Sequence, residues 1–207
     1  MEYNKGNFEK YVSKNPLKRK MVEKFNLKIV SIVEKMTEEI KLQGGGATIL
    51  DAGCGEGFID NILLENINSI KIKGLEYTRE ALEIAKEMNP KAEYIQGDIC
   101  NMPFADDFAD IIICTEVLEH LKQPEKAVHE LLRVGKKYVL ITVPDEPWFC
   151  MGNLVALKNI RRFGNPIDHI NHWTYRKFKR FVTTQFDGKI NFCKSFPWSI
   201  AVLNLEK

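Results

Sequence analysis

Apolar residues recur at two different spacings along this 207-residue chain. Between residues 8 and 43 they follow one another at three- and four-residue steps, which predicts an amphipathic helix. A break at Asn15-Pro16 precedes the regular part, and glycines 44–46 end it. Beyond the glycines, short apolar runs alternate with helical patterns, which is typical of a parallel sheet covered by helices.

This alternation predicts the individual elements of the sheet domain. The expected strands cover residues 48–51, 70–76, 92–96, 109–114, 138–143, 190–193 and 200–205, and the expected helices cover residues 58–65, 79–88, 124–134 and 174–183. Pro144 stops the alternation, and residues 145–173 show no clean period. A long irregular stretch in a compact domain is usually a lid or a substrate-binding region, so we expect that role here.

The most informative local pattern is Ile-Leu-Asp-Ala-Gly-Cys-Gly-Glu-Gly at residues 49–57, where a predicted strand gives way to a predicted helix. Gly53, Gly55 and Gly57 can adopt backbone angles closed to other residues and let a ligand approach the main chain. The first N–H groups of the helix favour an anionic group such as a carboxylate. The spacing G-x-G-x-G differs from the dinucleotide fingerprint G-x-G-x-x-G. A glycine-rich turn in some other α/β enzyme remains the alternative.

With Asp51 included, the pattern D-x-G-x-G-x-G resembles motif I of the class I S-adenosylmethionine-dependent methyltransferases. Further motifs similar to the type 11 family follow in family order within residues 47–143. The resemblance implies an α/β, doubly wound, Rossmann-like fold with a seven-stranded, mostly parallel sheet, an antiparallel last strand, helices on both faces and an N-terminal helical extension. It also implies S-adenosylmethionine as cofactor and S-adenosylhomocysteine as product.

The same resemblance assigns cofactor contacts. It implies that Glu76 binds the ribose hydroxyls, that Tyr77 lies beside one face of the adenine, and that Asp98 and Ile99 meet the adenine. The expected cofactor-binding residues are Asp51, Gly53, Cys54, Gly55, Glu76, Tyr77, Asp98, Ile99 and Thr115. Two plainer interpretations stay open: Glu76 as a solvated acid at a strand end, and Gly97-Asp98 as an Asx turn compatible with the same role.

Glu116-Val-Leu-Glu119-His120 supports two interpretations. Two carboxylates at i, i+3 and an imidazole could surround one divalent metal ion if a helix begins here, and the spacing is similar to E-x-x-E-H in small-RNA 2′-O-methyltransferases and ubiquinone-biosynthesis O-methyltransferases. The phrase also resembles one in type 11 methyltransferases without an established metal. We predict no metal, and Glu116, Glu119 and His120 form the alternative ligand set.

Asp168-His-Ile-Asn-His-Trp173 lies in the irregular stretch and resembles H-x-N-H-W-T phrases of type 11 methyltransferases. His169 and His172 are candidate general bases for the acceptor proton, and Glu116 is a third candidate catalytic residue. Equally, either histidine could simply hydrogen-bond the loop to the domain. We expect Trp173 in the core.

Composition narrows the possible partners. Thirty basic residues against 28 acidic ones give a net charge of +2, so neither nucleic acid nor a membrane is expected as a partner. Five scattered cysteines without a C-x-x-C pair, and an N-terminus unlike a signal peptide, indicate the cytoplasm.

Residues 1–207 are expected to form one domain, divided into a helical cap (1–43), a cofactor core (47–143) and a substrate loop with the last strands (144–207).

The predicted activity is methyl transfer to a small-molecule acceptor. The alternatives are a metal-dependent RNA 2′-O-methyltransferase, a non-catalytic S-adenosylmethionine-binding protein and a nicotinamide-dependent oxidoreductase. Tyr3, Phe8 and Tyr11 could place the N-terminal segment over the cofactor as a lid, or the segment could pack as a cap. Oligomeric state and acceptor identity are not predicted.

Overall fold

The computed structural model describes residues 11, 13–146, 148, 150, 151 and 169–206. Its elements in chain order are α2 (Pro16–Leu42), β1 (Ala47–Ala52), α3 (Phe58–Asn66), β2 (Ile70–Glu76), α4 (Arg79–Met88), β3 (Glu93–Gln96), β4 (Ala109–Thr115), the 3₁₀ turn η1 (Leu118–His120), α5 (Pro124–Val134), β5 (Gly135–Pro144), α7 (Tyr175–Gln185), β6 (Lys189–Ser195) and β7 (Trp198–Asn204). Tyr3, Phe8 and Asp168 lie outside the described residues.

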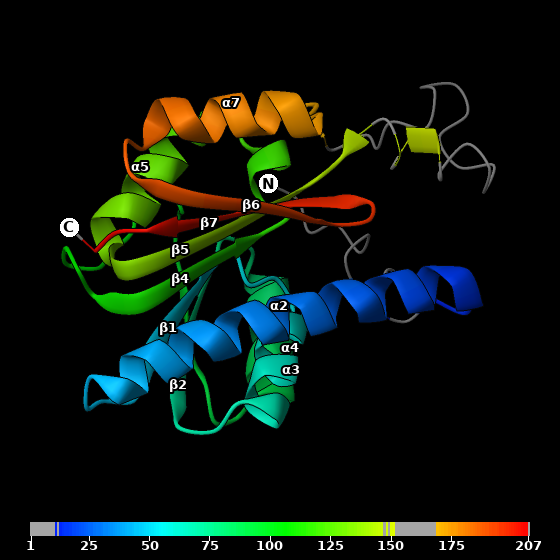
Figure 1. The fold of residues 1–207 in the computed structure, drawn as a ribbon. Helices are drawn as coiled ribbons and strands as arrows, with labels where there is room; N and C mark the ends of the chain where they lie inside the picture. Colours follow the sequence, from blue (N-terminus) through cyan, green and yellow to red (C-terminus); the bar gives the residue numbers. More distant parts are fainter. Residues whose placement is uncertain (1–10, 12, 147, 149, 152–168, 207) are drawn as a thin grey trace.

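The strands form one seven-stranded sheet in the order β3-β2-β1-β4-β5-β7-β6 (Figure 1). Strands β1 to β5 pair in parallel, whereas β7 runs antiparallel to both β5 and β6. The predicted mostly parallel sheet with an antiparallel last strand is therefore confirmed. Because the chain winds outward from β1 in one direction and from β4 in the other, the crevice beyond these two strands is where ligands bind in sheets of this kind.

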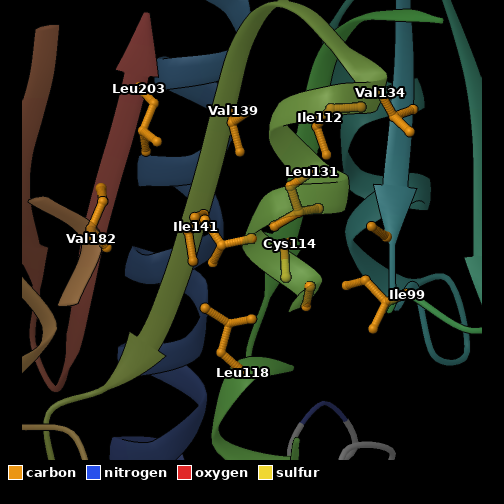
Figure 2. Packing of buried hydrophobic residues seen from close by; sticks show 14 of the residues in the cluster. Ile99, Ile112, Cys114, Leu118, Leu131, Val134, Val139, Ile141, Val182 and Leu203 are labelled. Atoms are coloured by element: carbon orange, nitrogen blue, oxygen red, sulfur yellow. The ribbon is translucent and has the colours of Figure 1, made fainter. Parts of the chain in front are cut away.

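Helices cover both faces of the sheet, as expected (Figure 1). On one face, α2 packs Phe25, Ile29 and Val33 into a core that includes Ile49 and Ile111. On the other face, α5 covers β4 and β5 and α7 covers β7. Leu131 of α5 and Val182 of α7 belong to one buried cluster with Ile112 and Ile141, and Figure 2 shows Leu131 near Ile112 and Ile141. Neighbouring residues of β4 point to opposite faces, and Ile111, Ile112, Ile113 and Cys114 are all buried, which explains the continuous apolar run in that strand.

The N-terminal helix begins where the sequence predicts. The Asn15 side chain caps α2 by accepting hydrogen bonds from the N–H groups of Leu17 (3.0 Å) and Lys18 (3.2 Å). Pro16 fits the first turn because its missing N–H would have no helical partner there. None of the helices in the described ranges has both the length and the apolar character that spanning a bilayer requires.

Candidate cofactor and acceptor site

The glycine turn after β1 is held against the end of β2. The N–H groups of Gly53 and Cys54 donate to the carbonyl of Leu75 at 2.7 and 3.1 Å. Gly53 has φ +87°, and a Cβ there would lie 2.5 Å from a methyl group of Val117 in the turn after β4. The close approach of these two turns therefore requires glycine at position 53.

Glu76, at the end of β2, reaches back over the glycine turn. One carboxylate oxygen accepts the N–H of Gly55 at 3.1 Å, and the other accepts the N–H and hydroxyl of Thr78, both at 2.8 Å. A carboxylate has about four acceptor positions, so one remains for a ribose hydroxyl. Tyr77 beside it is 52% exposed, which leaves its ring open to a ligand.

For the residues after β3, the sequence analysis predicts an adenine contact and, as a plainer interpretation, an Asx turn. Asp98 is exposed, and its Oδ1 accepts the N–H of Cys100 at 2.8 Å, so the Asx turn is present. Ile99 is only 6% exposed and packs in the core with Leu75 and Met102. Of the two side chains expected at the adenine, that of Asp98 is exposed and that of Ile99 belongs to the core.

A small cavity lies between the turns after β1 and β4, at the crevice position defined by the sheet order. Its lining consists of Tyr11, Gly53, Cys54, Phe58, Ile59, Thr115 and Glu116. The Tyr11 ring stacks on Phe58 with centroids 4.3 Å apart and planes 10° apart. Four predicted site residues thus meet in one place, and Tyr11 joins them from the N-terminal segment.

The backbone of Glu116 is left-handed, with φ +56°. A non-glycine residue pays a conformational penalty in that region, and such residues cluster at functional sites. Its N–H donates to the carbonyl of Thr142 at 3.2 Å, which fixes the turn against β5. The arrangement presents Glu116 to the cavity.

Beneath the glycine turn lies a buried polar network that the sequence analysis missed. Asp51 and Asp60 are 1% and 0% exposed. Burial, followed by the charge of Asp60, raises the pKa of Asp51, and burial raises the pKa of Asp60 from 3.8 to about 6. Tyr94 donates its O–H to Asp60 at 2.8 Å, while Asn89 donates to Tyr94 at 3.0 Å and to the carbonyl of Gly57 at 2.9 Å. The network braces the turn from below. Nothing in the sequence indicates this network, because single polar residues within predicted helices and strands do not reveal which side chains contact one another in the fold.

A second group of side chains lies after β4. Glu119 and His120 from η1 and His169 from the segment before α7 each offer one ligand atom, and the three atoms lie within 4.8 Å of one another. The rings of His120 and His169 meet edge to face, with centroids 5.0 Å apart. One carboxylate and two imidazoles suit a divalent transition metal ion. The alternative ligand set predicted from sequence is Glu116, Glu119 and His120. In the structure Glu116 lines the cavity, and His169 is the third residue of the group with Glu119 and His120.

Backbone hydrogen bonds hold these segments together. The N–H groups of Ile170 and Asn171 donate to the carbonyl of Glu119 at 2.8 and 3.0 Å. The side-chain amide of Asn171 donates to the carbonyls of Leu118 and Leu121 at 2.9 and 2.7 Å. A histidine-bearing stretch far along the chain is thereby fixed beside η1.

Glu146, which the sequence analysis did not identify, contacts both His169 and His172. Its Oε1 is 2.6 Å from Nδ1 of His169, and its Oε2 is 3.6 Å from Nδ1 of His172 and accepts the S–H of Cys150 at 3.0 Å. Burial opposes its charge, but the hydrogen bonds from His169 and Cys150 leave the pKa of Glu146 below its usual value. Burial and the same carboxylate raise the pKa of Cys150 to about 12.

The sheet order, the glycine turn and the acid at the end of β2 define the class I methyltransferase fold. Comparison with known families gives the same result, because residues 50–141 match the family model described as a methyltransferase domain, of type 11. This match supports the assignment of the chain to the class I S-adenosylmethionine-dependent methyltransferases, with S-adenosylmethionine as the cofactor.

Individual relatives agree with this assignment. A probable S-adenosylmethionine-dependent methyltransferase of Mycobacterium tuberculosis is 26% identical over 106 residues, which cover 50% of this chain and 38% of that protein. The mitochondrial ubiquinone biosynthesis O-methyltransferase of Schizosaccharomyces pombe is 28% identical over 167 residues, which cover 75% of this chain and 56% of that protein. The chain thus spans between about two fifths and somewhat more than half of these relatives.

Among solved structures, magnesium protoporphyrin IX methyltransferase from Synechocystis with bound S-adenosylhomocysteine has a similar fold. The TM-score is 0.68 at 13% identity, and the match covers 97% of this chain and 95% of that one. The likeness concerns the fold alone.

Proposed function

We propose that this protein transfers the methyl group of S-adenosylmethionine to a small-molecule acceptor. The observation that carries the proposal is the joint placement of the left-handed glycine turn, the Glu76 carboxylate above it and the cavity between β1 and β4. A nucleoside can place its ribose on Glu76 and its charged end along Gly53 and Gly55 in such a crevice.

The residues divide into a cofactor side and an acceptor side. On the cofactor side, Tyr77, Asp98 and Ile99 would contact the adenine. The cofactor, when bound, supplies an electrophilic methyl group, so the protein must align donor and acceptor and accept a proton from an O–H or N–H acceptor. His169 or His172 accepts that proton, and Glu116 lies where the cavity opens.

The chemical class of the acceptor is inferred from relatives. Proteins named as ubiquinone biosynthesis O-methyltransferases and a demethylmenaquinone methyltransferase match this chain, which supports a small cyclic acceptor methylated on oxygen or carbon. The net charge of +2 supports no extended nucleic-acid surface. The five free cysteines support a cytoplasmic setting.

Calorimetry with S-adenosylmethionine, S-adenosylhomocysteine and NAD tests the cofactor. We expect the first two to bind and NAD to give no heat of binding. Incubation with methyl-labelled cofactor and fractionated cell extract then tests the activity and identifies the labelled product. Binding without any labelled product across all fractions would favour a non-catalytic cofactor-binding protein.

A metal-assisted reaction is a second candidate, because Glu119, His120 and His169 bring their donor atoms within 4.8 Å of one another. These three residues would hold the ion, which would lower the pKa of an acceptor hydroxyl. Metal analysis of protein purified without chelators, with turnover before and after EDTA, decides this. Metal-dependent labelling of small RNA, but not of small molecules, would support the 2′-O-methyltransferase alternative.

A further inference from the structure

Glu146 is a buried carboxylate whose two oxygens are both occupied by side chains on the acceptor side. It is 5% exposed. A carboxylate removed from water is costly unless it is paired or hydrogen-bonded. Its partners are His169 at 2.6 Å, Cys150 at 3.0 Å and, less closely, His172 at 3.6 Å. A group held in this way has little freedom to rotate, so it can serve as a fixed reference for a histidine ring.

The contact at Nδ1 decides what the other nitrogen of His169 can do. A neutral imidazole carries one N–H and one lone pair, and a carboxylate at Nδ1 favours the hydrogen there. The lone pair is then left on Nε2. Both functions considered for His169, accepting a proton and binding a metal ion, require that lone pair.

We propose that Glu146 is a positioning residue that holds His169 by Nδ1, so that Nε2 presents its lone pair toward Glu119 and His120. This role rests on the proposed function, in which His169 belongs to the acceptor side. His172 is held less firmly, since its side chain is 45% exposed and its Nδ1 is farther from Glu146.

The Glu146 side chain can be changed without removing the bonds that place the segment. Ile170 and Asn171 are held by backbone bonds to Glu119, and the N–H of Glu146 itself donates to the carbonyl of Trp173 at 2.8 Å. None of these bonds uses the carboxylate. A variant at position 146 therefore removes the contacts of the carboxylate with His169, His172 and Cys150 and leaves these backbone bonds in place.

The test is nitrogen-15 NMR of protein labelled at histidine, studied as wild type, Glu146→Gln and Glu146→Ala at an alkaline pH where imidazoles are neutral. The chain has only four histidines, so single His→Gln variants assign the spectrum. His129, exposed on α5, is the internal reference, and Glu125→Gln, which changes an exposed acid on the same helix, is the control variant.

We expect His169 to be the Nδ1–H tautomer in wild type and in the control. Glu146→Ala should shift His169 to a mixture of tautomers. Glu146→Gln should give a tautomer ratio between those of wild type and Glu146→Ala, because an uncharged amide oxygen still accepts a hydrogen bond from Nδ1. Methyl transfer in the active extract fraction should fall at least tenfold in Glu146→Ala, with S-adenosylmethionine affinity changed less than twofold.

An Nε2–H tautomer in wild type, or the same tautomer in wild type and Glu146→Ala, would overturn the role of Glu146. Cofactor calorimetry on the same samples separates this outcome from failure of the proposed function. If wild type binds no S-adenosylmethionine, the proposed function fails, while the tautomer result still decides what Glu146 does.

Discussion

At the scale of single residues, Gly53 links backbone conformation to the proposed cofactor site. A Cβ at this position would meet Val117 at 2.5 Å, and φ is +87°. The left-handed conformation alone costs a non-glycine residue about 1–2 kcal/mol. We predict that Gly53→Ala lowers S-adenosylmethionine affinity about tenfold or more, measured by calorimetry. The control is Gly45→Ala, because a Cβ at Gly45 meets nothing within 4 Å. Equal affinity of the two variants would show that the turn does not hold the cofactor.

Asp60 gives a pH dependence of stability with a defined sign. Its pKa rises from 3.8 to about 6 because it is buried, so the folded protein binds more protons than the unfolded chain between these values. Its contribution to the free energy of unfolding is therefore present below about pH 4 and is lost as the pH rises through 6. The loss is on the order of 2–3 kcal/mol, since each pKa unit corresponds to about 1.4 kcal/mol.

Asp60→Asn removes this titration and keeps groups that can hydrogen-bond Tyr94. We predict that urea unfolding of wild type shows falling stability from pH 4 to pH 6, and that the variant shows a shallower slope over the same window. Asp187→Asn, at an exposed acid, is the control and should follow wild type. Parallel slopes in wild type and Asp60→Asn would mean that Asp60 does not cause the pH dependence.

At the scale of elements, the cap of α2 can be tested apart from the site. Asn15 accepts two N–H groups of the first turn, and loss of such a cap costs about 1 kcal/mol. We predict that Asn15→Ala lowers Tm by about 2–4 °C, which is typical of that loss in a chain of this size. Asn15→Asp keeps an acceptor and should stay close to wild type. Cofactor affinity should not change in either variant, because the cap lies outside the cavity lining.

The elements of the sheet could be predicted from sequence more completely than those around the acceptor. The observed bounds of β2, α4 and α5 are those expected, because each buries one periodic face or a continuous apolar run. Residues 116–120 gave no such period, and they form only the 3₁₀ turn η1 after a left-handed Glu116. Periodicity of apolar residues indicates burial against a sheet. This turn is instead shaped by hydrogen bonds to a segment about 50 residues further along the chain, which periodicity does not reveal.

The same distinction explains which site residues could be foreseen. Gly53 and Glu76 belong to a short pattern contained within one strand-turn-helix unit and the next strand, so local sequence identifies them. Glu146 acts on His169 from 23 positions away, and Asp60 acts on Tyr94 from 34 positions away. Neither pair has a spacing that indicates contact before the fold is known. His169 was foreseen only as one of two equivalent histidines, and its exposed neighbour His172 is distinguished by burial, which requires the structure.

At the scale of the whole molecule, the sheet separates the proposed cofactor side from the proposed acceptor side. The turn after β1 and the acid of β2 lie on one side of the crevice, and η1 with the segment before α7 lies beyond β4. None of the described hydrogen bonds joins Gly53 or Glu76 to the trio of Glu119, His120 and His169. Changes made on the two sides should therefore act largely independently, with the packing of Val117 against Gly53 as the contact that could couple them.

A double-mutant cycle of Gly53→Ala and His169→Ala tests this independence. We predict that Gly53→Ala raises the S-adenosylmethionine Kd and that His169→Ala leaves it unchanged within about twofold. His169→Ala should lower kcat by about 10²–10⁴-fold, the usual contribution of a general base, when the transfer is measured with saturating labelled cofactor. The double variant should combine both losses. If His169→Ala weakens cofactor binding as much as it slows turnover, His169 instead holds the fold of the crevice, because a residue acting only on the acceptor proton leaves the free energy of cofactor binding unchanged.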